Sequence, residues 1–137
     1  MYRIRKQFKF EAAHILESSY SKCCQQLHGH SYKLEVFITS EKLNEDGMVI
    51  DFGQLKDKLS KFLEVIDHTC FLPKKKWGLL GPPNEPFYFE ANPTAENMAQ
   101  IFYEHIKRIL DLNKLIKLEK VRVHETSTGY AEFSEEK

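Results

Sequence analysis

Apolar residues at alternate positions constrain the N-terminal part of this chain more than any other feature. From Tyr2 to His14 the even-numbered positions are mostly apolar and end on a histidine, and from His30 to Ile38 they are apolar after the histidine. A period of two is typical of strands with one buried face. The connection between the two segments, 15–27, is polar and is interpreted as a loop. We therefore expect an antiparallel pair of strands.

Two helices are indicated by apolar stripes of helical spacing. Asp51 resembles an N-cap with Gln54 as its reciprocal partner, and the stripe after it predicts a helix from about Phe52 to Ile66. Thr94 resembles the N-cap of a second helix. Its apolar stripe is expected to consist of Ile101, Phe102, His105, Ile109 and Leu112.

Shorter extended segments complete the pattern. A brief one is expected at 48–50, after the turn residues 44–47. Residues 118–133 indicate two strands around the turn 127–129, although Val121 and Val123 disagree in parity with Ile116 and Leu118. The order ββααββ predicts an α+β fold, with two helices on one face of a four-stranded antiparallel sheet.

Residues 72–93 interrupt this regular pattern. Their prolines and glycines exclude a long helix. Their aromatic and aliphatic residues are too numerous for a disordered linker. We expect an ordered insertion at about 73–92, packed on its own domain or on a neighbouring subunit. The chain as a whole, 1–137, is expected to form a single domain.

The composition excludes several classes of protein. Twenty Lys and Arg balance twenty Asp and Glu, which argues against a general nucleic-acid-binding protein. No apolar stretch approaches the roughly 20 residues of a membrane helix. Residues 1–15 lack an apolar signal core, so we expect a cytoplasmic protein. Its three cysteines are poorly placed for disulfides and are expected to be reduced.

Three histidines form a candidate metal site. His28 and His30 bracket a glycine, and in an extended segment their side chains point to the same face. Pairing of the two strands would bring them to His14. Three imidazoles with an open fourth position are typical of catalytic zinc, although imidazole also binds iron, nickel and copper. The alternative, which the residues alone leave equally open, is a hydrogen-bonded core histidine at 14 and two loop histidines.

Four further residues carry possible chemistry. Cys24 lies four residues before His28, where a nearby metal would favour its thiolate. His68 follows Asp67, whose carboxylate could orient the His68 ring. The alternative, which the pattern slightly favours, is that His68 only complements the C-terminus of the preceding helix. Glu125 could accept two parallel hydrogen bonds from a planar N–H edge. The pattern favours the alternative, a solvated carboxylate at a strand end.

Taken together, these residues resemble the 6-pyruvoyl-tetrahydropterin synthase family, whose bacterial branch forms 6-carboxy-tetrahydropterin in the queuosine pathway. The resemblance covers nearly the whole chain and is specific because the motifs occur jointly and in order. The motifs are Phe10–His14, Cys24 with His28–His30, Gly47–Phe52, Asp67–His68, Asn92–Asn97 and Glu125–Thr126.

The resemblance implies a fold, an assembly and a set of residue roles. Three four-stranded sheets would close a twelve-stranded barrel, and two trimers would stack as a homohexamer with active sites between subunits. Zinc would be held by His14, His28 and His30. Cys24 would be the catalytic base, with Asp67 and His68, from a different subunit, completing proton transfer. Glu125 would anchor the pterin ring, and Thr94 would line its pocket.

The resemblance also implies a reaction. The substrate would be 7,8-dihydroneopterin triphosphate, and neither nucleic acid nor membrane would be a partner. The three residues between Cys24 and His28 favour the carboxy-forming branch, which releases acetaldehyde and triphosphate. The alternatives are formation of 6-pyruvoyl-tetrahydropterin, a non-catalytic zinc- and pterin-binding module, and a purely structural zinc domain. Two departures from the family pattern are the insertion after Leu72 and His124, where relatives often have lysine.

Overall fold

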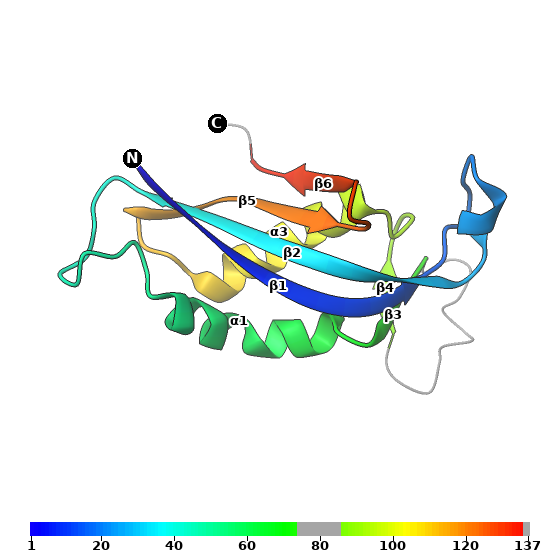
Figure 1. The fold of residues 1–137 in the computed structure, drawn as a ribbon, viewed down its shortest axis with the longest axis horizontal. Helices are drawn as coiled ribbons and strands as arrows, with labels where there is room; N and C mark the ends of the chain where they lie inside the picture. Colours follow the sequence, from blue (N-terminus) through cyan, green and yellow to red (C-terminus); the bar gives the residue numbers. More distant parts are fainter. Residues whose placement is uncertain (74–85, 136–137) are drawn as a thin grey trace.

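A long, curled sheet organises the molecule, with two helices packed against it (Figure 1). The computed structural model describes residues 1–73 and 86–135. In chain order the elements are β1 (Tyr2–His14), η1 (Lys22–Gln25), β2 (His28–Ser40), α1 (Phe52–Ile66), β3 (Thr69–Pro73), β4 (Phe87–Phe89), α3 (Ala95–Leu110), β5 (Ile116–His124) and β6 (Tyr130–Phe133). The strands lie in the order β4-β3-β1-β2-β5-β6.

Strands β1 and β2 form the expected antiparallel pair. They pair without interruption from Tyr2 opposite Ser40 to His14 opposite His28. In the second half of β1 the even positions are buried and the odd ones are exposed or only partly buried, so the period of two translates directly into one covered face. The two helices lie on that face, and their apolar side chains share one core with it.

Helix α1 has the predicted limits, and the Asp51 carboxylate accepts a hydrogen bond from the Gln54 amide at 3.0 Å. Helix α3 begins after its predicted cap, where the Thr94 hydroxyl accepts from the Asn97 amide at 3.2 Å.

The predicted buried stripe of α3 is wrong at several positions. The buried residues are Met98, Ala99, Phe102, Tyr103, Ile106 and Leu110. Ile109 is 40% exposed, and the helix ends before Leu112. Apolar residues occur on more than one side of this helix, so the pattern alone did not determine which side faces the sheet.

The sheet is mixed and six-stranded, which corrects the prediction of a four-stranded antiparallel sheet. β3 runs parallel to β1, from Thr69 opposite Ala12, and β4 runs parallel to β3. Of the predicted insertion, 74–85 lies outside the described residues, while its flanks supply part of β3 and all of β4. The predicted extended run at 48–50 is not a strand, because it follows a turn in which the Asn44 side chain accepts from the Met48 amide.

An irregularity in β5 explains its ambiguous parity. Phe37 pairs with Lys120, but the next residue of β2, Ile38, pairs with Leu118. Glu119 is therefore the extra residue of a β-bulge, which resets the alternation. Both Leu118 and Val121 are buried as a result, although their numbers differ in parity. The two predicted C-terminal strands are confirmed as β5 and β6.

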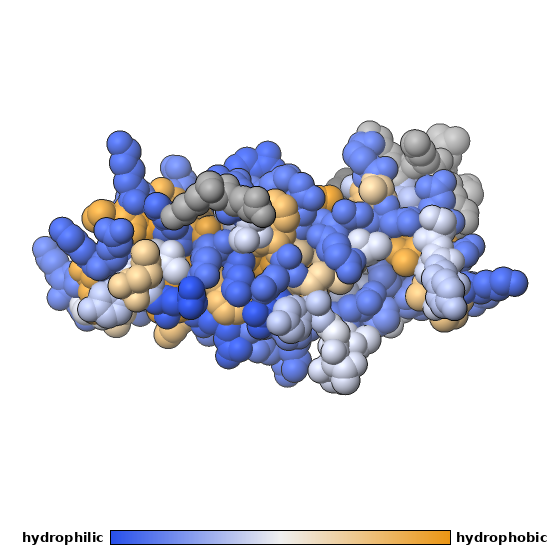
Figure 2. Space-filling view, turned by 90° about the horizontal axis from the view of Figure 1, so that it is seen from above, coloured by the Kyte–Doolittle hydropathy of each residue, from blue (hydrophilic) through white to orange (hydrophobic). Residues whose placement is uncertain are grey.

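The opposite face of the sheet is polar and linked by ion pairs. Arg5 donates to Glu35 across β1 and β2, and Arg122 donates to Glu132 across β5 and β6. Seen from above, where β5 and β6 lie in Figure 1, hydrophilic residues cover most of the surface (Figure 2). No helix in the described part of the chain is long and apolar enough to cross a membrane.

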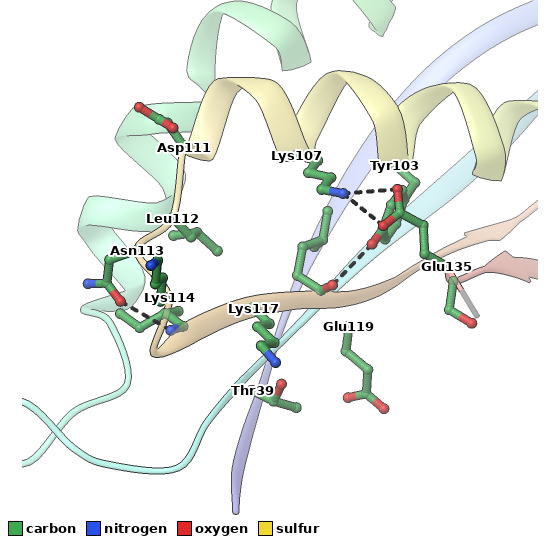
Figure 3. Close-up of a pocket in the computed structure, with 13 residues that line it drawn as sticks. Thr39, Tyr103, Lys107, Asp111, Leu112, Asn113, Lys114, Lys117, Glu119 and Glu135 are labelled. Carbon is green, nitrogen blue, oxygen red and sulfur yellow. Dashed lines mark hydrogen bonds and ion pairs between the residues drawn. The ribbon is translucent and has the colours of Figure 1, made fainter. Parts of the chain in front are cut away.

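A cavity of about 540 Å³ lies between the end of α3 and β5 (Figure 3). Lys107, Asp111 and Lys117 are among its lining residues, and Tyr103 lies at its inner side. None of the residues predicted for the functional site lines this cavity.

Candidate metal and ligand site

The pairing of β1 with β2 brings three histidine side chains together. His14 lies directly opposite His28, and His30 follows two residues later on the same face. The Nε2 atoms of His14 and His28 are 2.9 Å apart. One nitrogen from each of the three rings lies within 4.8 Å of the others. Such a group can hold one ion, and it fits zinc, iron, nickel or copper by its chemistry.

Backbone carbonyl groups orient two of these rings. The Nδ1 atom of His14 lies 2.8 Å from the Pro93 carbonyl oxygen, and that of His28 lies 2.7 Å from the Gln26 carbonyl oxygen. A carbonyl only accepts, so both Nδ1 atoms carry the hydrogen and both Nε2 atoms are free to coordinate. A hydrogen bond from the other ring nitrogen to a backbone carbonyl fixes the tautomer of a metal-binding histidine.

Burial keeps two of the rings neutral. His14 is 1% exposed, and this burial lowers its pKa below the ordinary value. Burial also lowers the pKa of His30. Neutral imidazole is the form that binds metals. The Nε2 atom of His30 is buried and has no hydrogen-bond partner among the described residues, as expected of a nitrogen placed to coordinate.

Glu125 lies against the histidines rather than pointing freely into solvent. Its Oε1 atom is 3.3 Å from Nε2 of His14 and 3.5 Å from Nε2 of His30, and its side chain is 35% exposed. It comes directly after β5, on the same side of the sheet as the buried Val123. The site therefore combines a cluster of neutral nitrogens with one adjacent carboxylate.

A loop before α3 supports the histidines. The Asn92 side chain accepts from the Glu17 amide at 2.6 Å and donates to the Ser18 carbonyl at 3.1 Å. Asn92 thereby ties the segment after β1 to the segment that carries the Pro93 carbonyl. Thr94 caps α3 next to this carbonyl. Thr94 is therefore the next residue after the one whose carbonyl contacts His14, although no hydrogen bond among the described residues joins its side chain to a histidine.

Asp67 and His68 form a pair at the start of β3. The Asp67 Oδ1 atom is 3.0 Å from Nδ1 of His68 and accepts from the Glu11 amide at 2.9 Å. The Glu11 amide, ahead of the smaller effect of His68, lowers the pKa of this carboxyl. His68 has a positive φ of 54° and a side chain that is 78% exposed. No contact within the described residues joins the pair to the three histidines.

Cys24 lies in η1, in the connection between the two long strands. Its backbone amide donates to Ser21, and its carbonyl accepts from Leu16. The thiol is free and partly buried, and it is not part of the histidine cluster. Within one chain the structure therefore brings Glu125 to the histidines but leaves Cys24 and the Asp67–His68 pair separate.

A surface groove of about 530 Å³ has His30 and His68 among its lining residues. Its other lining side chains include Glu11 and Ser31, which are joined by a 2.6 Å hydrogen bond. Cys70 also lines it. His68 of the Asp67–His68 pair and His30 of β2 therefore share the lining of this groove.

Sequence reasoning missed the supporting groups of the site. The carbonyls of Gln26 and Pro93 give no sequence signal, because every residue has a carbonyl and only the folded chain selects one. Tyr32 belongs to the apolar row of β2, and its buried ring also lies against those of His14 and His30. Its position two residues after His30 is the signal that could have identified it.

Comparisons with known proteins give a consistent result. Residues 3–136 match the family model described as 6-pyruvoyl tetrahydropterin synthase. A protein from Aquifex aeolicus named 6-carboxy-5,6,7,8-tetrahydropterin synthase is 34% identical over 165 residues, with 98% of this chain and 99% of that protein covered. A protein of the same name from Helicobacter pylori strain J99 is 33% identical over 145 residues, which cover 94% of this chain and 70% of that protein.

Two solved structures have the same fold. An uncharacterized protein from Wolinella succinogenes superposes with a TM-score of 0.79 at 22% identity, with 98% of each chain covered. The 6-pyruvoyl tetrahydropterin synthase of Caenorhabditis elegans gives a TM-score of 0.72 at 24% identity, with 98% of this chain and 96% of that chain covered. At these identities the likeness concerns the fold alone.

Proposed function

Because the chain belongs to the 6-pyruvoyl tetrahydropterin synthase family, we propose that it converts 7,8-dihydroneopterin triphosphate to 6-carboxy-tetrahydropterin, acetaldehyde and triphosphate. This reaction would place it in queuosine biosynthesis. The observation that carries the proposal is the convergence of three histidines beside one carboxylate. That arrangement offers a place for a metal and, beside it, an acceptor for ring N–H groups. It fits a ligand with an oxygen-bearing side chain on a flat nitrogen heterocycle.

Each group of the site has a separate task in this proposal. His14, His28 and His30 hold zinc, which supplies Lewis-acid polarisation of the side-chain oxygens when bound. The carboxylate of Glu125 accepts hydrogen bonds from the pyrimidinone edge and so orients the ring. Thr94 helps to line the pocket. The burial of His14 excludes water from the inner side of the site and keeps its nitrogen unprotonated.

Proton transfer requires the groups that lie apart in one chain. We propose that Cys24 removes a proton from the substrate side chain and that His68, oriented by Asp67, moves one. The exposed His68 ring is accessible to a neighbouring copy. A homohexamer of two stacked trimers, with sheets closed into a barrel, would bring Cys24 of one subunit to the Asp67–His68 pair of another. Three free thiols support a reducing, cytoplasmic location.

Two arguments favour the carboxy-forming branch over the pyruvoyl-forming one. Three residues separate Cys24 from His28, which resembles the carboxy-forming pattern. The relatives from Aquifex and Helicobacter carry the corresponding name. The alternative is a 6-pyruvoyl-tetrahydropterin synthase that eliminates triphosphate from the same substrate.

Product identification tests this proposal. Purified protein loaded with zinc is incubated with 7,8-dihydroneopterin triphosphate, and the products are identified by mass spectrometry. The expected products are the 6-carboxy pterin and acetaldehyde. Pyruvoyl pterin alone would transfer the assignment to the sister reaction, and no turnover at any protein concentration would contradict both.

A second candidate is a zinc- and pterin-binding module without turnover, favoured by the separation of Cys24 from the histidines within one chain. Cys24→Ala distinguishes the two, with the adjacent exposed Cys23→Ala as the matched control. For an enzyme, Cys24→Ala abolishes turnover and retains zinc, while Cys23→Ala leaves both unchanged. A binding module would show no difference between the variants in either measurement.

A further inference from the structure

Tyr32 is held rigidly beside the histidines. It lies on β2 two residues after His30, on the same side of the strand. Its ring stacks on Phe10 with centroids 4.8 Å apart and planes 5° from parallel. The rings of His14 and His30 approach it edge-on, with centroids 6.1 and 5.5 Å away. These contacts fix the direction of the hydroxyl group.

The Tyr32 hydroxyl has no hydrogen-bond partner within residues 1–73 and 86–135. The residue is 1% exposed, and its oxygen forms no hydrogen bond with any described residue. A buried hydroxyl without a partner destabilises a folded protein relative to the same ring without the oxygen. Phenylalanine would keep the stacking on Phe10 and avoid that penalty. Packing and stability therefore explain the ring of Tyr32 but not its hydroxyl.

Tyr32 also lies across the sheet from the residue that carries the carboxylate of the site. Lys33 pairs with His124, so the next step of the same antiparallel register places Tyr32 opposite Glu125. A phenol carries its hydrogen at neutral pH and is therefore available as a donor.

We propose that the Tyr32 hydroxyl donates a hydrogen bond to an oxygen atom of the bound pterin, an inference that rests on the proposed function. While the Glu125 carboxylate accepts from ring N–H groups, it cannot satisfy an oxygen of the ligand. A pterin with a hydroxylated side chain offers two kinds of acceptor oxygen, the ring carbonyl next to the N–H edge and the side-chain hydroxyls on the other ring. Tyr32 is the unpartnered buried donor beside Glu125 that can satisfy one of them.

Equilibrium binding of two fluorescent probes tests this inference. Zinc-loaded wild type, Tyr32→Phe and Tyr103→Phe are titrated with neopterin, which carries side-chain hydroxyls, and with 6-methylpterin, which has only the ring carbonyl. Tyr103 is the matched control, because it is also buried but its hydroxyl donates to the Leu118 carbonyl at 3.3 Å (Figure 3). The melting temperature of each metal-free variant is measured in parallel.

Tyr32→Phe is expected to bind neopterin about 2- to 12-fold more weakly, the loss that one neutral hydrogen bond produces. Its melting temperature should equal or exceed that of wild type. Tyr103→Phe should melt about 2–5 °C lower and bind both probes normally. Weaker binding of both probes to Tyr32→Phe would identify the ring carbonyl as the acceptor, and weaker binding of neopterin alone would identify a side-chain hydroxyl.

Two results would overturn the inference, and they are distinguishable. If wild type binds both probes and Tyr32→Phe binds them equally well, Tyr32 does not contact the ligand, while the proposed function stands. If wild type binds neither probe, the proposed function fails as well.

Discussion

Asn92 is expected to control the affinity of the histidine site without touching it. Its side chain accepts from the Glu17 amide at 2.6 Å and donates to the Ser18 carbonyl at 3.1 Å. Replacement by alanine removes both bonds. At a net 0.5–1.5 kcal/mol each, the free energy of unfolding should fall by about 1–3 kcal/mol. The more specific effect is on Pro93, whose carbonyl accepts the Nδ1 hydrogen of His14 at 2.8 Å.

Loss of such an outer-shell partner lowers metal affinity by about 10- to 100-fold. The Pro93 carbonyl remains in the Asn92→Ala variant and only its restraint is lost, so we expect the lower end, about tenfold. Zinc dissociation constants are measured by competition with a chromophoric chelator at fixed pH. Unfolding of the metal-free protein in guanidinium chloride gives the stability change. Asn92→Asp, which keeps the acceptor and loses the donor, should be intermediate in both.

Asn44 provides the matched control. Its side chain also organises a loop, accepting from the amides of Asp46 and Met48 at 2.9 Å each, but beyond the opposite end of β2 from His28. Asn44→Ala should destabilise the protein and leave zinc affinity unchanged. If Asn92→Ala and Asn44→Ala bind zinc equally tightly, the idea that this loop positions His14 is wrong.

Three other predictions concern the core, the polar face and the metal. Ile106→Ala should cost about 2–5 kcal/mol of unfolding free energy, because Ile106 is fully buried, whereas Ile109→Ala should change it by less than about 0.5 kcal/mol, as measured by denaturant unfolding. Burial raises the pKa of Glu35, but hydrogen bonds from His124 and Arg5 outweigh it and the net direction is downward. The folded protein thus loses stability as pH falls below the ordinary carboxyl range. Glu35→Gln should reduce the slope of unfolding free energy against pH in this acid range by up to about 1.4 kcal/mol per pH unit, and Glu64→Gln on the exposed side of α1 is the control that should leave the slope unchanged. Removal of zinc by a chelator should lower the melting temperature but leave the far-UV circular dichroism spectrum that of a folded protein. Zinc at 100 times its dissociation constant should raise the melting temperature again by about 9 °C. Unfolding on chelation would instead indicate a structural zinc domain.

Local patterns predicted the elements whose contacts are regular. The limits of β1 and α1 follow from an uninterrupted alternation and from a cap at Asp51. The convergence of His14 with His28 follows in turn from the antiparallel pairing. These features can be predicted from residues that are adjacent in sequence and from the rule that two strands joined by a loop pair antiparallel.

Other features depend on contacts between distant segments. β3 and β4 are short and pair in parallel with strands that are not adjacent in sequence, so neither has a strong local signal. The bulge at Glu119 shows as a conflict in parity, but the conflict alone does not identify its cause. The face of α3 was misassigned because Ile101 and Ile109 suggested an apolar stripe that the sheet does not cover.

The site shows the same division. Its ligating nitrogens were recognisable because histidine is a chemically distinctive residue at a strand end. Its supporting carbonyls at Gln26 and Pro93 were not, because only the tertiary structure decides which carbonyl meets a ring. The proposed roles of Cys24 and His68 depend on quaternary structure, because an assembly of several chains would have to bring these two residues together.

One strand alternation determines both stability and chemistry in this fold. The even positions of β1 bury Phe8 and Phe10 in the middle of the sheet and, on the same face, His14 at its end. The same face therefore carries core residues and a candidate metal ligand. A one-residue insertion in the middle of β1 would turn His14 to the opposite face while the strand could still pair. Such a variant should lose metal binding together with the core contacts of the β1 residues that follow the insertion. The register of β1 against β2 is therefore constrained both by the core in the middle of the sheet and by the histidines at its end.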